Sequence, residues 1–215
     1  MRKTRGNIPA KARRLVSELD EISHLAPTNV GRSKVIAYAA VFSAFYLLLS
    51  YSVAITIGPV LRGSGAHLFR ALLMVLVAAR LGVPGGATMM GIISGVLLLA
   101  VPAPAAFLYF PGTVAAGLVY DLSLRGNFAR NSTNSKRILT GSLLSGIAES
   151  VIVTGGFFLI GFSFTEIITA LAASGYASAG IIGIWIFALG KNIIMTTVGV
   201  GFAFTMIRML ARRKL

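Results

Sequence analysis

The sequence predicts an all-α integral membrane protein, a bundle of six transmembrane helices preceded by a short N-terminal cytoplasmic amphipathic helix. Two observations predict this fold class: 56% of the 215 residues are hydrophobic and only 12% are charged, and the mean hydropathy is +0.83. Soluble domains carry about 25% charged residues, and a chain this apolar lacks the polar surface that water requires. Lipid is therefore the expected surroundings of most of the chain.

The first 34 residues form a basic cytoplasmic leader, which precedes the predicted six-helix domain at 35–212. A short amphipathic helix is expected from Pro9 to about Leu25, with Leu15, Leu19 and Ile22 on one face. Such a helix rests on anionic lipid headgroups, although docking to a partner remains an alternative.

Six apolar segments follow the leader, and each is expected to form one helix. They cover about 35–57, 66–81, 84–101, 105–124, 138–162 and 179–209, with an interruption of the fourth at Pro111-Gly112. The second and third are short, because a bilayer core of about 30 Å needs roughly 20 helical residues. A short interfacial helix is expected at 164–173, between the fifth and sixth segments.

The distribution of basic residues predicts the orientation of the bundle. With six spans and both termini in the cytoplasm, only Arg62, Arg70 and Lys191 of the 20 Lys and Arg residues fall outside the cytoplasmic side. This asymmetry is what the positive-inside rule describes. At the inner end of the fourth segment, Asp121 and Arg125 are four residues apart and are expected to pair locally.

Two opposite charges fall near the middle of the last two predicted spans, Glu149 in the fifth and Lys191 in the sixth. A charge at the bilayer centre costs about 2.5–3.5 kcal/mol on insertion scales. The two residues are expected either to pair as an architectural lock or to face a polar substrate cavity, with Asn192 as a neutral hydrogen-bonding neighbour. Trp185 either stacks on a flat ligand or, as we favour, anchors the helix at the interface.

The connection between the first two spans gathers glycines and cations on the outer side. Arg62, His67 and Arg70 lie there among glycines, a composition that suits a mobile gate. His67 is interpreted as an ordinary surface residue, since no second histidine or acidic cluster supports a metal. In the first span, Ala40 and Ala44 are four apart, as are Ala39 and Ser43, which allows another helix to approach closely.

Several function classes find no support in the sequence. The chain has no cysteine, which excludes thiolate chemistry, and it contains no phosphate-binding loop and no zinc-protease or hydrolase motif. An enzyme is therefore not expected, and no cofactor is implied. The pI near 11.2 does not indicate nucleic-acid binding, because the basic residues lie between and beside apolar spans.

These features together resemble the substrate-binding (S) components of energy-coupling factor (ECF) transporters. The resemblance is carried by Ala40-x-x-x-Ala44, the Gly58-Pro59 to Gly65 loop, the LGVPGGA segment at 81–87 followed by GxxSG at 91–95, the Pro102/Pro104 loop and the Lys191-bearing last helix. It implies capture of a vitamin or vitamin precursor, powered by separate ATPase subunits and a coupling transmembrane subunit.

The same resemblance implies where the solute and the coupling subunit bind. Glu149, Trp185, Lys191 and Asn192 would contact the solute in the outer half of the bundle, with Arg62 or Arg70 near the gate. Ala40 and Ala44 would meet the coupling subunit. The substrate stays open, since Glu149 with Trp185 suits a cationic aromatic molecule and Lys191 suits an anionic group.

Two other functions compete with solute capture. The chain is alternatively a self-sufficient small-solute transporter or channel, although the two halves of the predicted bundle show no convincing inverted repeat. It is alternatively a non-transport membrane assembly protein, in which Glu149 and Lys191 only lock the helices together.

Overall fold

The structure is a computed structural model that describes residues 31–56, 62–100, 106–126, 128–132, 134–159 and 180–212. Within those ranges every regular element is helical, which confirms the all-α prediction. The elements are α2 (Arg32–Thr56), α3 (Arg62–Leu81), α4 (Gly86–Leu99), α5 (Ala106–Ser123), the one-turn α6 (Phe128–Asn131), α7 (Ser135–Leu159) and α9 (Gly180–Arg212). The predicted helices at 9–25 and 164–173 lie outside the described residues.

Each of the six long helices coincides with one predicted apolar segment, with two differences. α5 continues through Pro111 instead of being interrupted there; the proline lies early in the helix, where it removes a single backbone hydrogen bond. α3 begins at Arg62 rather than near residue 66. This earlier start adds about one helical turn before His67 and Arg70, which therefore lie well inside the helix.

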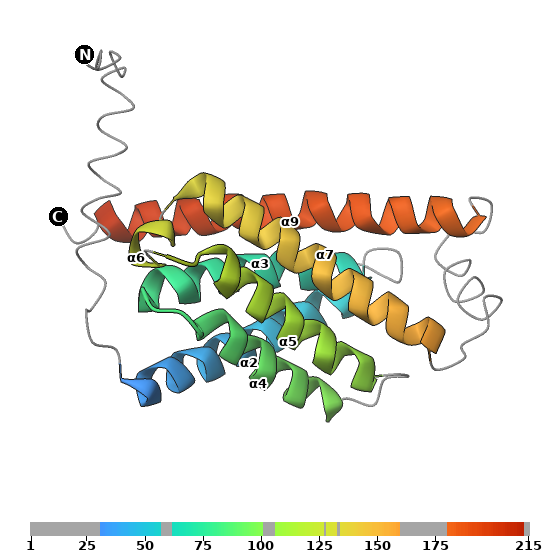
Figure 1. The fold of residues 1–215 in the computed structure, drawn as a ribbon, viewed down its shortest axis with the longest axis horizontal. Helices are drawn as coiled ribbons and strands as arrows, with labels where there is room; N and C mark the ends of the chain where they lie inside the picture. Colours follow the sequence, from blue (N-terminus) through green and yellow to red (C-terminus); the bar gives the residue numbers. More distant parts are fainter. Residues whose placement is uncertain are drawn as a thin grey trace, which may run out of the picture.

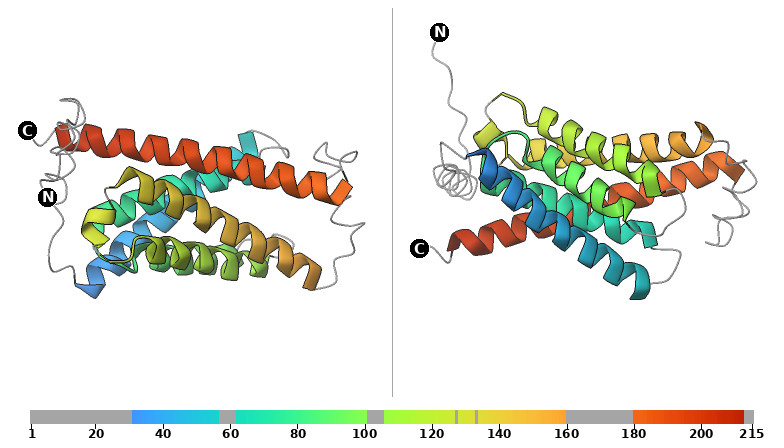
Figure 2. Two further views of the ribbon diagram at one scale, coloured as in Figure 1. Left: turned by 45° about the horizontal axis from the view of Figure 1, so that its top comes forward. Right: turned by 90° about the horizontal axis from the view of Figure 1, so that it is seen from below.

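The long helices form a bundle in which successive helices run in opposite directions (Figures 1 and 2). α3 contacts α2, α4, α7 and α9, and α5 lies between α4 and α7. The starts of α2, α4 and α7 and the ends of α3, α5 and α9 gather at one end of the bundle, on the left of Figure 1. We call it the basic end, because it carries Arg32, Lys34, Arg80, Arg125, Arg130, Lys136, Arg137, Arg208 and Arg212.

Glycines allow several helix pairs to approach backbone to backbone. A Cβ atom at Gly91 of α4 would overlap the carbonyl oxygen of Thr113 in α5, and one at Gly117 of α5 would overlap that of Ala87 in α4. Gly199 of α9 faces the carbonyl oxygen of Leu68 in α3 in the same way. Close approach through small residues is typical of helix packing in lipid.

The bundle is apolar on its outside as well as in its core. Large hydrophobic side chains are exposed on all the long helices except the central α3, for example Phe45, Leu118, Val151 and Ile194. Besides a hydrophobic core, the described interior contains buried polar and charged side chains. They are Ser43, Arg70, Ser94, Thr113, Asp121, Ser132, Ser142, Ser145, Glu149 and Thr196.

Two helices of the described part are long and apolar enough by themselves to cross a membrane. The qualifying stretches are Arg32–Val53 in α2 and Leu189–Leu210 in α9, and Gly86–Leu99 is an apolar but shorter helix. Membrane association is thus weakly indicated by length and hydropathy.

Candidate polar site between α3, α7 and α9

A buried ion pair joins the central helix to α7. The Nη1 atom of Arg70 contacts Oε2 of Glu149, and the two side chains are only 4% and 8% exposed. This corrects the expected pairing of the two buried charges, because Glu149 pairs with Arg70 and not with Lys191. Arg70 is eight residues into α3, about 12 Å along the helix axis, which brings its side chain to the level of Glu149.

His67, one turn before Arg70, completes a three-residue cluster. Its Nδ1 atom lies 2.7 Å from Nη2 of Arg70 and 3.5 Å from Oε2 of Glu149. A guanidinium can only donate hydrogen bonds, so Nδ1 accepts one and carries no proton. The neutral ring therefore holds its proton on Nε2, which leaves that atom as a donor.

Small residues on α5 and α7 make room for this cluster. A Cβ atom at Gly112 of α5 would lie 3.3 Å from Cγ of Glu149, and one at Gly146 of α7 would lie 4.0 Å from Nη2 of Arg70. Tighter packing by larger residues would push α5 away from the Glu149 side chain. Gly112 thus belongs to the local architecture of the ion pair, whereas a Cβ at Gly146 would make only ordinary contact with Arg70.

Lys191 and Asn192 of α9 lie beside the cluster and face different neighbours. Lys191 is half-buried and directly precedes Asn192, so it lies on the turn of α9 beside the turn of α7 that carries Glu149 and Ser150. Among the described acidic residues, neither Glu149 nor Asp121 forms an ion pair with it. Asn192 instead faces α7, where its amide nitrogen donates to Oγ of Ser150 at 3.1 Å.

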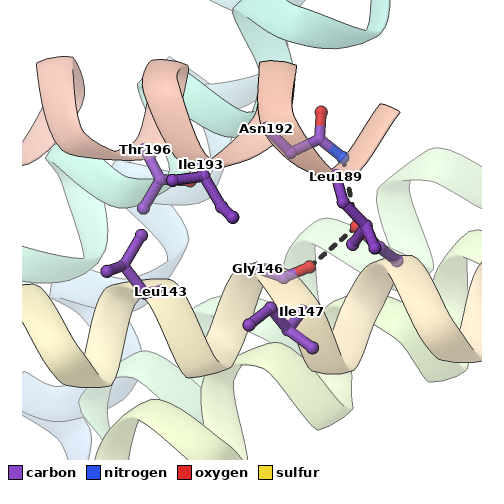
Figure 3. A pocket seen from close by; sticks show the side chains of 8 residues that line it. Leu143, Gly146, Ile147, Leu189, Asn192, Ile193 and Thr196 are labelled. Carbon is purple, nitrogen blue, oxygen red and sulfur yellow. Dashed lines mark hydrogen bonds between the residues drawn. The ribbon is translucent and has the colours of Figure 1, made fainter. Parts of the chain in front are cut away.

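A shallow groove separates α7 from α9 next to this hydrogen bond (Figure 3). The empty space along the groove, including the part open to the surroundings, is about 190 Å³. Beside it, the Ser150 hydroxyl donates a hydrogen bond to the carbonyl oxygen of Gly146 at 2.8 Å. The lining residues are Leu143, Gly146, Ile147, Ser150, Leu189, Asn192, Ile193 and Thr196. The groove is mainly apolar, with Asn192 and Ser150 as its polar contact.

The structure describes the remaining predicted site residues only in part. Arg62 is the first residue of α3 and Trp185 lies in the first part of α9, and their side chains are outside the described part of the structure. Ala40 and Ala44 are exposed on α2, whereas Ser43 is buried and donates to the carbonyl oxygen of Met90 at 3.1 Å. The two small-residue rows of α2 therefore face opposite surroundings.

A second buried carboxylate, that of Asp121, lies at the basic end, and its partner differs from the predicted one. Oδ2 of Asp121 accepts hydrogen bonds from the backbone nitrogens of Gly85 at 3.1 Å and Thr88 at 2.8 Å, and from Oγ1 of Thr88 at 2.6 Å. Its partner is the N-terminus of α4 and not Arg125, which lies beyond the end of α5 and is exposed. Free N–H groups and the positive end of the helix dipole favour a carboxylate there.

The described residues contain no group of three His, Asp or Glu side chains that could hold a metal ion. Comparison with known proteins gives no relative: no family model matches the chain, and no curated protein or solved structure matches it. The site is therefore interpreted from its own geometry. That geometry offers hydrogen-bond donors around a carboxylate that is already engaged.

Proposed function

We propose that the chain is the membrane-embedded substrate-capture subunit of an ECF-type uptake transporter for a vitamin or vitamin precursor, powered by separate ATPase and coupling subunits. The observation that carries the proposal is the buried cluster of Arg70, Glu149 and His67, with Lys191 beside it, inside a bundle whose outer surface is apolar. Ionisable groups inside a membrane bundle are costly, and they usually mark a pathway or binding site.

Three features support a six-span membrane topology with the basic end in the cytoplasm. Many large hydrophobic side chains are exposed while the buried side chains include charges, and glycines allow close contact of α4 with α5 and of α3 with α9. Cations gather at one end of the bundle, as the positive-inside rule predicts for the cytoplasmic side. α4 spans only about 21 Å, so its ends depend on neighbouring helices for cover.

The coupling subunit is proposed to contact the exposed Ala40–Ala44 row of α2. Leucine at both positions would keep a neighbouring helix at a distance, so the double variant Ala40→Leu/Ala44→Leu should lose co-purification with the coupling subunit. Solute binding should be unchanged, because the row faces away from the cluster. Val41→Leu, at an exposed position between the two alanines, is the matched control and should retain the partner.

Reconstitution in liposomes tests the proposed function. The chain alone should bind a small solute but not accumulate it, and uptake should require ATP together with the coupling and ATPase subunits. Uptake by the chain alone would support a self-sufficient transporter instead. A chain that binds no small molecule would contradict solute capture.

The internal pairing of Glu149 with Arg70 favours one alternative, a membrane assembly protein in which the ion pair is purely architectural. The charge-free variant Arg70→Met/Glu149→Leu separates the two functions, since apolar residues of similar volume often replace buried ion pairs without loss of stability. Solute capture predicts that this variant folds but binds the solute more weakly, because His67 loses the Arg70 donor that keeps its proton on Nε2. An architectural role predicts that it folds and keeps its cellular function.

A further inference from the structure

We infer that the captured solute carries an anionic group, which binds at the ammonium of Lys191 and the Nε2–H of His67. This inference rests on the proposed function and narrows the class of solute that the site takes. The sequence alone left both a cationic and an anionic solute open. The structure separates them, because it shows which charges of the site are already compensated.

Glu149 is not available to a cationic solute. Its carboxylate contacts the guanidinium of Arg70 and lies 3.5 Å from Nδ1 of His67, in a side chain that is 8% exposed. A cationic group could bind Glu149 only by displacing Arg70. The displaced guanidinium would remain buried without a counter-charge, which is strongly unfavourable.

The two polar groups of the site that are not part of the ion pair, His67 and Lys191, are both hydrogen-bond donors. His67 accepts from Arg70 through Nδ1 and keeps a proton on Nε2, and the ammonium of Lys191 can only donate. No described residue is found to accept a hydrogen bond from Nε2 of His67 or from Nζ of Lys191. The His67 side chain is 14% exposed and Lys191 is half-buried, so a ligand can supply the acceptor.

The described acidic residues leave a surplus of positive charge at this place. The two cations Arg70 and Lys191 are accompanied by one carboxylate, Glu149, because Asp121 is hydrogen-bonded to the start of α4 at the basic end. The other acidic residues, Glu18, Asp20, Glu21 and Glu166, lie outside the described residues. An anionic solute supplies both the missing acceptor and the compensating charge.

The test starts from the compound that purifies with the full chain from its native membranes, identified by native mass spectrometry. The expected compound is a small water-soluble molecule with a carboxylate or phosphate. Lys191→Met should weaken its binding by about tenfold or more, because a charge-assisted hydrogen bond is lost. Lys191→Arg should retain most of the affinity, and Lys136→Met, an exposed cation at the basic end, should bind like the wild type.

The same compound with its acidic group converted to a neutral amide or ester adds a second comparison. The wild type should bind this neutral derivative at least tenfold more weakly, whereas Lys191→Met should distinguish the two forms much less. Each variant is first checked for a wild-type elution volume in size-exclusion chromatography. A loss of affinity in a folded Lys191→Met protein then reports on the site.

Three results would overturn the inference while leaving solute capture intact. They are a bound solute that is cationic, a bound solute that is neutral, and a folded Lys191→Met protein that binds the solute like the wild type. Recovery of a phospholipid as the only bound anion would assign the donors to a lipid headgroup and would overturn it as well. The absence of any bound small molecule would instead contradict the proposed function itself.

Discussion

The two buried carboxylates, Asp121 and Glu149, are compensated in different ways. Asp121 is held by the backbone nitrogens of Gly85 and Thr88 and by the Thr88 hydroxyl at the start of α4. Glu149 is held by side chains of α3, the guanidinium of Arg70 and, at a longer distance, His67. The donors to Asp121 thus include backbone groups that the fold fixes, whereas Glu149 depends on ionisable side chains of another helix.

The surroundings of the two carboxylates differ as well. Asp121 faces a single helix terminus, and its role is to join α5 to α4. Glu149 lies where α3, α5 and α7 meet, and the turn of α9 that carries Lys191 and Asn192 lies beside the same part of α7. We therefore interpret Asp121 as architecture and the Glu149 cluster as the place where the bundle meets a ligand.

Removal of the Glu149 charge should have the largest effect on stability. Glu149→Leu leaves Arg70 buried without its counter-charge, and the free energy of unfolding should fall by about 3–5 kcal/mol. The double variant Arg70→Met/Glu149→Leu should recover most of that loss. Chemical denaturation in detergent measures both, and a Glu149→Leu protein as stable as the wild type would contradict the buried ion pair.

Loss of the close glycine contact between α3 and α9 should have the second-largest effect on stability. Alanine at Gly199 would overlap the carbonyl oxygen of Leu68, so Gly199→Ala should destabilise the bundle by about 1–3 kcal/mol. Gly201→Ala, two residues along the same helix with open space around its Cβ, is the control. It should be neutral or slightly stabilising, and equal effects of both variants would disprove the close approach of the two helices.

Loss of the Asp121 carboxylate should have a smaller effect, confined to stability. Asp121→Ala removes the acceptor at the start of α4 and should cost about 0.5–2 kcal/mol, with no change in solute affinity. Arg125→Ala should leave stability unchanged, since Arg125 is not the partner. An equal loss of stability in Arg125→Ala would instead support the local pair of Asp121 with Arg125 that the sequence suggested.

The hydrogen bond between Asn192 and Ser150 should contribute least. A single neutral hydrogen bond contributes about 0.5–1.5 kcal/mol, and Asn192→Ala and Ser150→Ala should each lose about that much. Because the two residues share one bond, the double variant should lose no more than about the larger single loss. If the double variant loses the sum of the two single losses in unfolding free energy, the two side chains do not share a hydrogen bond.

Much of the fold was predictable because apolar segments and the connections between them leave a strong sequence signal. The six helices fall on the six predicted segments, and the cations gather at the end where the charge count placed them. The start of α3 was missed because Arg62 and the glycines after it suggest a loop. Contacts with α2, including that between Gly65 and Val53, instead support a helix from Arg62 onward.

The candidate site was predicted less well, for a physical reason. Residue spacing shows depth along a helix but not which neighbour a side chain faces, so Glu149 and Lys191 at similar depth suggested a pair. The ion-pair partner of a charged residue depends on which helices touch. Because α3 contacts α7, it brings Arg70 against Glu149, and Lys191 of α9 is not the partner. Likewise, the spacing of four residues between Asp121 and Arg125 suggested a local pair. The true partners of Asp121 lie more than 30 positions earlier in the sequence.

Thiol accessibility in intact cells tests the central claim that this charged cluster lies inside a membrane-spanning bundle. The chain has no cysteine, so single cysteines report without background. With Thr56→Cys at the end opposite the basic end and Lys136→Cys at the basic end, a membrane-impermeant maleimide should label only the first until the membrane is opened. Equal labelling of both positions in intact cells, or recovery of the chain in the soluble fraction, would contradict the account.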